Sequence, residues 1–141
     1  MHFFVEYHAH IAVLTARLLL GFLFFFQGYD AMFRVGVKNV VNAYSASFSA
    51  KGIPPWMTRA GSWYTAASEL TGGLMLLLGL GHYIALLLLA INIVVASIAF
   101  GINRPMWDTK FVLPRLLLLL FLLMVPPSLH MLALDNLLWQ Y

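Results

Sequence analysis

Four long stretches of mostly apolar residues constrain this chain more than any other feature. They cover about residues 11–33, 60–81, 83–103 and 111–134. A helix needs about 20 predominantly apolar residues to cross the hydrocarbon core of a membrane, and each stretch reaches that length. We therefore predict an all-α fold, in which residues 1–141 form a single integral membrane domain built as a four-helix bundle.

The composition excludes several other classes of protein. Charged residues make up only 9% of the 141 positions and hydrophobic residues 62%, whereas typical soluble domains are about 25% charged. A soluble enzyme or a disordered tail is therefore excluded. The formal charge is only +3 and the basic residues do not cluster, so we expect no nucleic-acid partner. The chain has no cysteine, which excludes a disulfide framework and a thiol nucleophile.

Lys and Arg are distributed unevenly between the two faces of the predicted bundle. They occur in the loops after the first and third stretches, as Arg34, Lys38, Lys51, Arg59, Arg104 and Lys110. The N-terminus, the short turn near His82 and the C-terminus carry none. Because Lys and Arg favour cytoplasmic loops, we expect both loops in the cytoplasm and both termini outside. The expected location is the bacterial cytoplasmic (inner) membrane, crossed several times.

The first loop contains a segment of about residues 36–50 in which apolar residues recur at helical spacing. Val37, Val40, Tyr44 and Phe48 alternate with polar residues on the opposite face, as in an amphipathic helix that lies in the membrane interface. The sequence Gly52-Ile53-Pro54-Pro55 ends this pattern. Two interpretations stay open: an ordinary connector, or a lid over a pocket.

Three charged residues and one amide lie within the apolar stretches. An ionised side chain near the bilayer centre costs about 2.5–3.5 kcal/mol on insertion scales, so Arg17, Glu69 and Arg115 each need a partner or a purpose. Glu69 lies at a depth from which it can pair with either arginine, and Asn92 can add an interhelical hydrogen bond. One interpretation is a buried ion pair that fixes helix register. Another is that the surplus positive charge binds an anionic group: a quinone oxygen, a lipid phosphate or a small oxyanion. A third is that an arginine extends to its own interface.

The histidines suggest only a weak metal or haem hypothesis. His8, His10 and His82 fall on the predicted outer face, and imidazole is the commonest metal ligand. However, His8 and His10 are two positions apart, which places them on opposite sides of a helix, so a shared site would require an extended N-terminus. The sequence contains no recognisable catalytic constellation, and we do not expect the chain to be an enzyme on its own.

Several motifs resemble the DoxX family of small four-helix membrane proteins. They are Ala16-Arg17-Leu18-Leu19-Leu20-Gly21, Gln27-Gly28, Gly52-Ile53-Pro54-Pro55, Glu69-Leu70-Thr71-Gly72-Gly73-Leu74 with Leu78-Gly79-Leu80, and Ser128-Leu129 with Asp135. The resemblance implies a four-helix bundle that serves as a partner or subunit of membrane oxidoreductase systems, among them quinone-reducing thiosulfate oxidoreductases. Family members often have His-Gly followed by Lys where this chain has Gln27-Gly28, so a basic residue there is lost or replaced by Arg34.

These observations leave three hypotheses of function. The first is a non-catalytic or quinone-associated subunit or partner of a membrane oxidoreductase complex. The second is a redox participant in its own right, with a quinone bound near Arg17, Glu69 and Asn92, Glu69 relaying a proton and an arginine polarising a carbonyl oxygen. The third is a protein that transports a small anion or a lipid. The partners we expect are membrane lipids together with other membrane subunits or further copies of the chain, and quinone is the cofactor under consideration.

Overall fold

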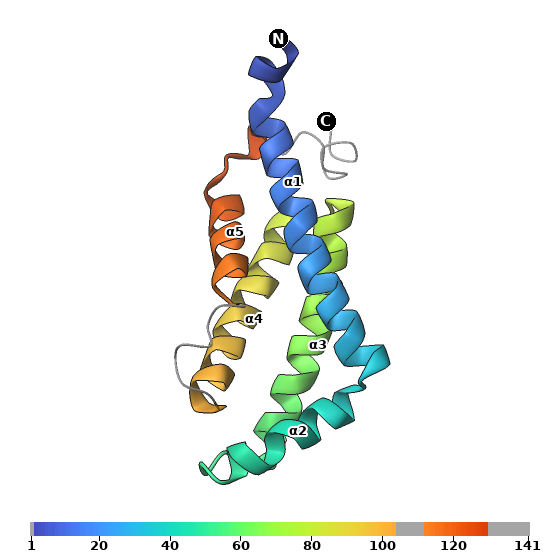
Figure 1. Ribbon diagram of the computed structural model, residues 1–141, viewed down its shortest axis with the longest axis vertical. Helices are drawn as coiled ribbons and strands as arrows, with labels where there is room; N and C mark the ends of the chain where they lie inside the picture. The colour runs from blue at the N-terminus through green and yellow to red at the C-terminus, as the bar shows by residue number, and fades with distance from the viewer. Residues whose placement is uncertain (1, 104–111, 130–141) are drawn as a thin grey trace.

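The computed structural model describes residues 2–103 and 112–129, and this part of the chain is helical with short turns (Figure 1). The prediction of an all-α fold is confirmed. The elements are α1 (His2–Tyr29), a π-helical turn η1 (Asp30–Arg34), α2 (Val37–Ser49), α3 (Pro55–Leu78), α4 (His82–Asn103), α5 (Leu113–Met124) and a 3-10 turn η3 (Pro127–Leu129).

Residues at the helix ends explain why α3 and α4 lie side by side. α3 starts at Pro55, whose missing N–H costs nothing in the first helical turn. It ends at Gly79, which has a φ of 70° and donates its amide to the carbonyl of Leu76. Only three residues, Gly79 to Gly81, separate α3 from α4. Such a short turn reverses the direction of the chain, so the two helices run antiparallel.

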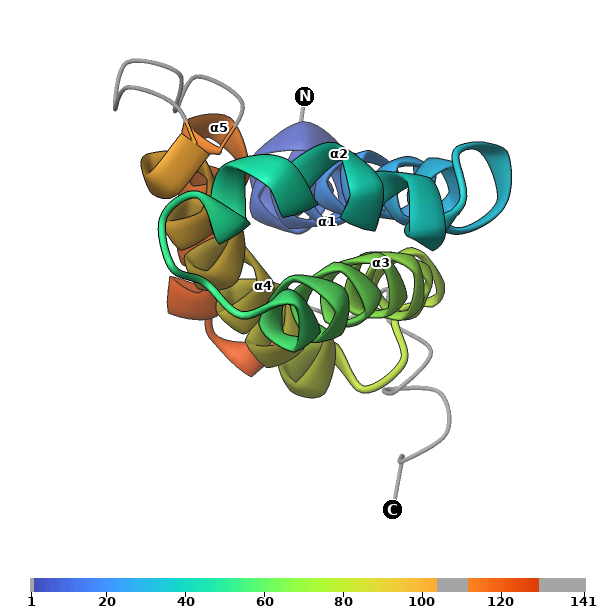
Figure 2. The same cartoon turned by 90° about the horizontal axis from the view of Figure 1, so that it is seen from below.

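The long helices pack around a shared core of leucine and phenylalanine. α1 packs along α3, α3 packs along α4, and the shorter α5 contacts both α1 and α4. Leu20 and Phe24 of α1, Leu76 of α3, Leu89 of α4 and Leu119 of α5 are almost completely buried between them. Seen from below, α2 lies across the end of the molecule at which α3 begins (Figure 2).

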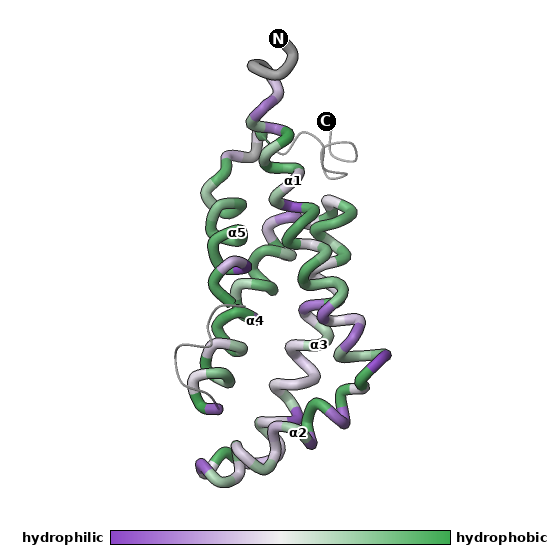
Figure 3. Tube along the Cα trace, in the orientation of Figure 1, coloured by the Kyte–Doolittle hydropathy of each residue, from purple (hydrophilic) through white to green (hydrophobic). Residues whose placement is uncertain are grey.

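Two helical segments are long and apolar enough to cross a membrane: Tyr7–Arg34, and α4 over His82–Asn103. Their outward faces carry large apolar side chains, such as Phe26 and Leu87, that are more than half exposed. Figure 3 shows apolar residues along α1, α4 and α5, whereas α2 and the first half of α3 are more polar.

The structure does not extend these properties to the other two expected spans. The 24 residues of α3 include polar side chains in the first half, where the sequence reads Pro-Trp-Met-Thr-Arg-Ala-Gly-Ser. α5 has only 12 residues and ends at Met124, just before Pro126 and Pro127, and Val125 is already extended. Of the fourth expected span, 111–134, residues 111 and 130–134 lie outside the described residues.

The amphipathic segment expected at about residues 36–50 is α2. Val37 and Phe48 are buried on its inner face, and Lys38 and Asn42 are exposed on its outer face. A glycine with positive φ stands on either side of the helix, Gly36 at 82° and Gly52 at 80°. These two glycines let the chain turn sharply into and out of α2.

Candidate functional site

A cavity of about 270 Å³ lies where the end of α1, α2, the first half of α3 and the second half of α4 meet. Its walls differ in chemistry. Val40, Tyr44 and Phe48 of α2 face Val95 and Ala99 of α4 as apolar and aromatic walls, with further aliphatic side chains around them. The amphipathic helix predicted in the first loop therefore supplies one wall of a pocket.

The third wall is polar and belongs to a single face of α3. Thr58, Ser62, Thr65 and Glu69 all line the cavity. They are spaced by four, three and four residues, which places them one above another on the same side of a helix. The stripe starts with Thr58 near the beginning of α3 and ends at the carboxyl group of Glu69.

Glu69 lies at the inner end of the cavity, where three helices converge. Its side chain is buried, with only 4% of its surface exposed. The oxygen Oε1 accepts a hydrogen bond from Gln27 Nε2 of α1 at 2.8 Å and another from Asn92 Nδ2 of α4 at 3.0 Å. No described residue donates to the second oxygen, Oε2. One oxygen of Glu69 therefore joins α1, α3 and α4.

Close approach of two backbones brings Gln27 to Glu69. A β-carbon at Gly28 would lie 2.8 Å from the carbonyl carbon of Glu69 and from Cα of Leu70. A β-carbon at Gly73 would lie 2.8 Å from Cα of Phe25. Only glycine fits between helices packed this tightly. We call this contact between α1 and α3 the glycine seam; it requires glycine at positions 28 and 73, whereas Gly72 faces Leu89 of α4.

Arg17 and Arg115 both lie apart from the cavity lining. Arg17 is buried on α1, with 4% of its surface exposed. Arg115 of α5 lies over the ring of Phe24, 5.7 Å from the ring centre, and interacts electrostatically with Glu69. Among the described residues that line the cavity there is no Lys or Arg.

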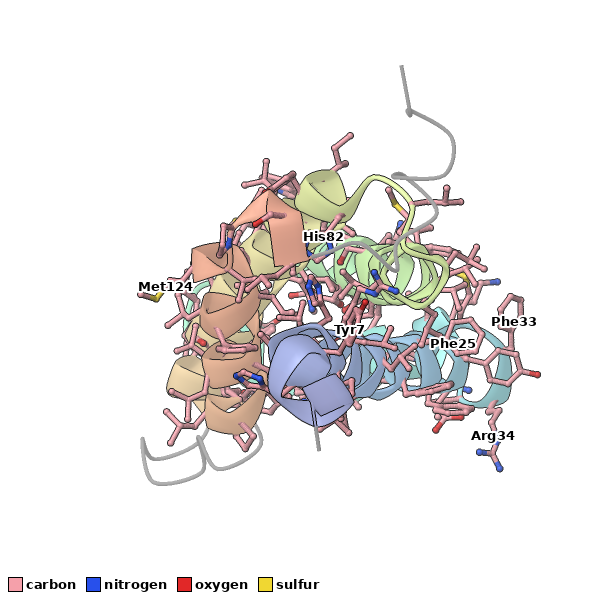
Figure 4. All side chains as sticks on the ribbon, turned by 90° about the horizontal axis from the view of Figure 1, so that it is seen from above. Tyr7, Phe25, Phe33, Arg34, His82 and Met124 are labelled. Carbon is pink, nitrogen blue, oxygen red and sulfur yellow. The ribbon has the colours of Figure 1, made fainter. Side chains whose placement is uncertain are left out.

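Arg34, the expected replacement for a basic family residue, lies at the surface. It pairs with Asp30 one turn earlier, at 3.1 Å, and its side chain is 72% exposed. Viewed from above, Arg34 and Phe33 point away from the helices (Figure 4). Arg34 therefore contributes nothing to the cavity.

The structure does not gather the histidines into a metal site. A site shared by His8 and His10 would require an extended N-terminus. Both residues instead lie on the continuous helix α1. His10 shares a hydrogen bond of 3.2 Å with the carbonyl of Leu129, and His82 is buried at the start of α4 (Figure 4). Over residues 2–103 and 112–129, no three His, Cys, Asp or Glu side chains lie close enough to hold a metal ion.

Reasoning from the sequence identified Glu69 and Asn92 and missed the other polar residues of the cavity. Gln27 entered only as a departure from a family motif, although it donates directly to Glu69. The cavity-lining hydroxyl residues Thr58, Ser62 and Thr65 were not predicted from the sequence. Their spacing, traced back from Glu69 along one helix face, is the signal that would have found them.

A comparison with known protein families matches the DoxX family over residues 12–102, almost two thirds of the chain. The matched region includes every described residue that lines the cavity, together with Asn92 and the glycine seam. No curated protein and no solved structure gives a significant match. With this match over most of its length and two long apolar helices, the chain belongs to the DoxX family of membrane proteins.

Proposed function

We propose that this protein is a quinone-associated, non-catalytic subunit or partner of a bacterial inner-membrane oxidoreductase complex. The observation that carries the proposal is the cavity with apolar walls and one carboxylate at its inner end. A quinone has the matching chemistry, because its ring is apolar on both faces and its polar oxygens lie at the ring edge.

The size of the cavity supports a headgroup rather than a whole lipid. Ligand pockets range from about 300 to about 1,000 Å³, and this one, at about 270 Å³, falls just below that range. A single substituted ring fits such a volume, while an isoprenoid tail would extend outside it into the membrane.

The lining favours a neutral headgroup over an anion. Glu69 is its single carboxylate, and the described lining residues include no Lys or Arg to balance a second negative charge. Burying an anion beside a carboxylate is costly unless a cation contacts it, and Arg115, which interacts with Glu69 from α5, does not line the cavity. A phosphate or small oxyanion is therefore a poorer candidate than a quinone.

The lining also supports a binding role rather than catalysis on its own. The hydroxyls of Ser62 and Thr65 donate to backbone carbonyls of α3, and no described histidine lines the cavity to activate them. Any electron transfer would then depend on a partner protein. In this proposal α3 and α5 also cross the membrane, and α2 lies at the cytoplasmic interface.

The test is to block the cavity without disturbing the helices. Gly61 lines the cavity, and a β-carbon there meets no atom within 4 Å. Gly61→Leu would fill part of the space with an apolar side chain. Gly101→Leu is the matched control, because Gly101 also lies in a helix with nothing within 4 Å and does not line the cavity.

Both variants and the wild type would be extracted in mild detergent, and the quinone bound per protein would be measured by mass spectrometry of the solvent extract. We expect quinone with the wild type and with Gly101→Leu, and at least a fivefold loss with Gly61→Leu. Native mass spectrometry of the same preparations would show whether another membrane subunit co-purifies. Absence of quinone from all three proteins would refute the proposal.

A further inference from the structure

We propose that the cavity binds the reduced, hydroxyl-bearing form of its ligand, a hydroquinone, more tightly than the oxidised quinone. This inference rests on the proposed function and adds to it a preference for one redox state. The basis is that hydrogen-bond acceptors outnumber hydrogen-bond donors at the inner end of the cavity.

The first acceptor is Oε2 of Glu69. Both neighbouring amides, Gln27 and Asn92, donate to Oε1, at 2.8 and 3.0 Å. No described residue donates to Oε2, although the side chain is 96% buried and lines the cavity. A carboxylate oxygen that faces a cavity accepts hydrogen bonds from whatever occupies that cavity, whether water or a ligand O–H group.

The hydroxyl groups next along α3 add acceptors rather than donors. Ser62 Oγ donates its hydrogen to the carbonyl of Thr58 at 2.8 Å. Thr65 Oγ1 donates to the carbonyl of Ser62 at 3.1 Å. A hydroxyl has one hydrogen and two lone pairs, so each of these groups has its oxygen lone pairs left to offer a ligand.

Fewer donors than acceptors remain: the hydroxyl hydrogens of Thr58 and Tyr44, which also line the cavity, and one amide hydrogen of Gln27. The amide of Gln27 has one N–H left after its bond to Glu69, and it brings its own carbonyl oxygen as a further acceptor. A quinone carries two carbonyl oxygens and no donor, so placing one beside Oε2 opposes two acceptors. A hydroquinone carries two O–H groups and can donate one of them to Oε2.

The preference is measurable as a ratio of two affinities. The purified protein in lipid nanodiscs would be titrated anaerobically with decylubiquinol and, separately, with decylubiquinone. We expect decylubiquinol to bind at least tenfold more tightly. For a two-electron couple a tenfold ratio corresponds to about 30 mV, so the midpoint potential of the bound couple should rise by about 30 mV or more. The dimethyl ether of decylubiquinol, which has the same ring and no O–H, should lose the advantage.

Glu69→Gln is the informative variant, because it exchanges one atom at the cavity. The side-chain oxygen of the new amide can still accept from Gln27 and Asn92, so the nitrogen would take the position of Oε2 and present a donor. We expect the preference to vanish or reverse in favour of decylubiquinone, with the midpoint potential falling accordingly. A purely structural role of Glu69 would weaken both ligands equally and leave the ratio unchanged.

Thr65→Val is the second variant, since it removes a neighbouring acceptor while keeping the side-chain shape. It should reduce the ratio without reversing it. Equal affinity for the two redox forms in the wild type, or a ratio unaltered by Glu69→Gln, would overturn this inference while leaving the proposed function standing. Failure of both forms to bind, with Gly61→Leu indistinguishable from wild type, would instead overturn the proposed function.

Discussion

Substituting Gly28 by alanine should separate α1 from α3 and loosen Gln27 from Glu69. The β-carbon would lie 2.8 Å from two backbone atoms of α3 and closer still to the amide nitrogen of Leu70, whereas ordinary van der Waals contact begins at 3.4 Å. The obstructing atoms are backbone and cannot rotate away, so the helices must move apart by more than 0.6 Å. A shift of that size would take the Gln27–Glu69 distance from 2.8 Å to about 3.4 Å, close to the limit of a hydrogen bond.

Two costs contribute to the expected destabilisation. Forcing an extra carbon into a well-packed contact typically costs about 1–3 kcal/mol. Weakening a hydrogen bond to a charged group forfeits part of about 1.5–3 kcal/mol. Alanine recovers about 0.5–1 kcal/mol because it favours the helix more than glycine does. We therefore expect Gly28→Ala to lower the free energy of unfolding by about 2–4 kcal/mol.

Unfolding by SDS in mixed micelles, followed by tryptophan fluorescence, would measure this change. Gly61→Ala is the matched control, because it makes the same exchange in α3 where a β-carbon meets nothing within 4 Å. That variant should be as stable as the wild type or slightly more stable. If Gly28→Ala and Gly61→Ala unfold at the same SDS fraction, the glycine seam does not hold α1 against α3 and the reasoning is wrong.

Two further predictions concern the junction of the helices and the orientation of the chain. Asn92→Asp replaces the amide that donates to Glu69 with a second buried carboxylate. In the same SDS titration it should lower the free energy of unfolding by at least about 2 kcal/mol, more than the loss of that hydrogen bond alone. A variant as stable as the wild type would contradict the role of this bond. Because the chain has no cysteine, single introduced cysteines report membrane topology directly. In intact spheroplasts a membrane-impermeant maleimide should label Tyr7→Cys and leave Lys51→Cys unlabelled. The reverse pattern would refute the proposed orientation.

The burial of Glu69 could be predicted, because an ionisable side chain in an apolar stretch is stable only where other polar groups contact it. Counting residues along the apolar stretches also predicted that Asn92 could form an interhelical hydrogen bond. It forms one with Glu69. Depth along a helix follows from the chain alone, since each residue rises by about 1.5 Å.

Rotation about the helix axis does not follow from the chain in the same way. Gln27 reaches Glu69 because the glycine seam fixes how α1 faces α3, and that contact depends on two helices at once. Whether the amphipathic segment of the first loop is a connector or a lid stayed open in the sequence, because only the three-dimensional arrangement puts Tyr44 and Phe48 opposite the hydroxyl stripe of α3. The length of α5 could not be judged either, since the leucine run of the sequence continues as far as the proline pair.

The glycine seam also divides the cavity into a stiff half and a compliant half. Backbone touches backbone between α1 and α3, with no side chains to readjust, so the Gln27–Glu69 end keeps fixed dimensions. The opposite wall is α2, which is flanked by two glycines and tied to α4 by a hydrogen bond of 2.5 Å between Ser47 and Asn103. A change in the volume of the cavity should therefore come from displacement of α2, while the Gln27–Glu69 end keeps its dimensions.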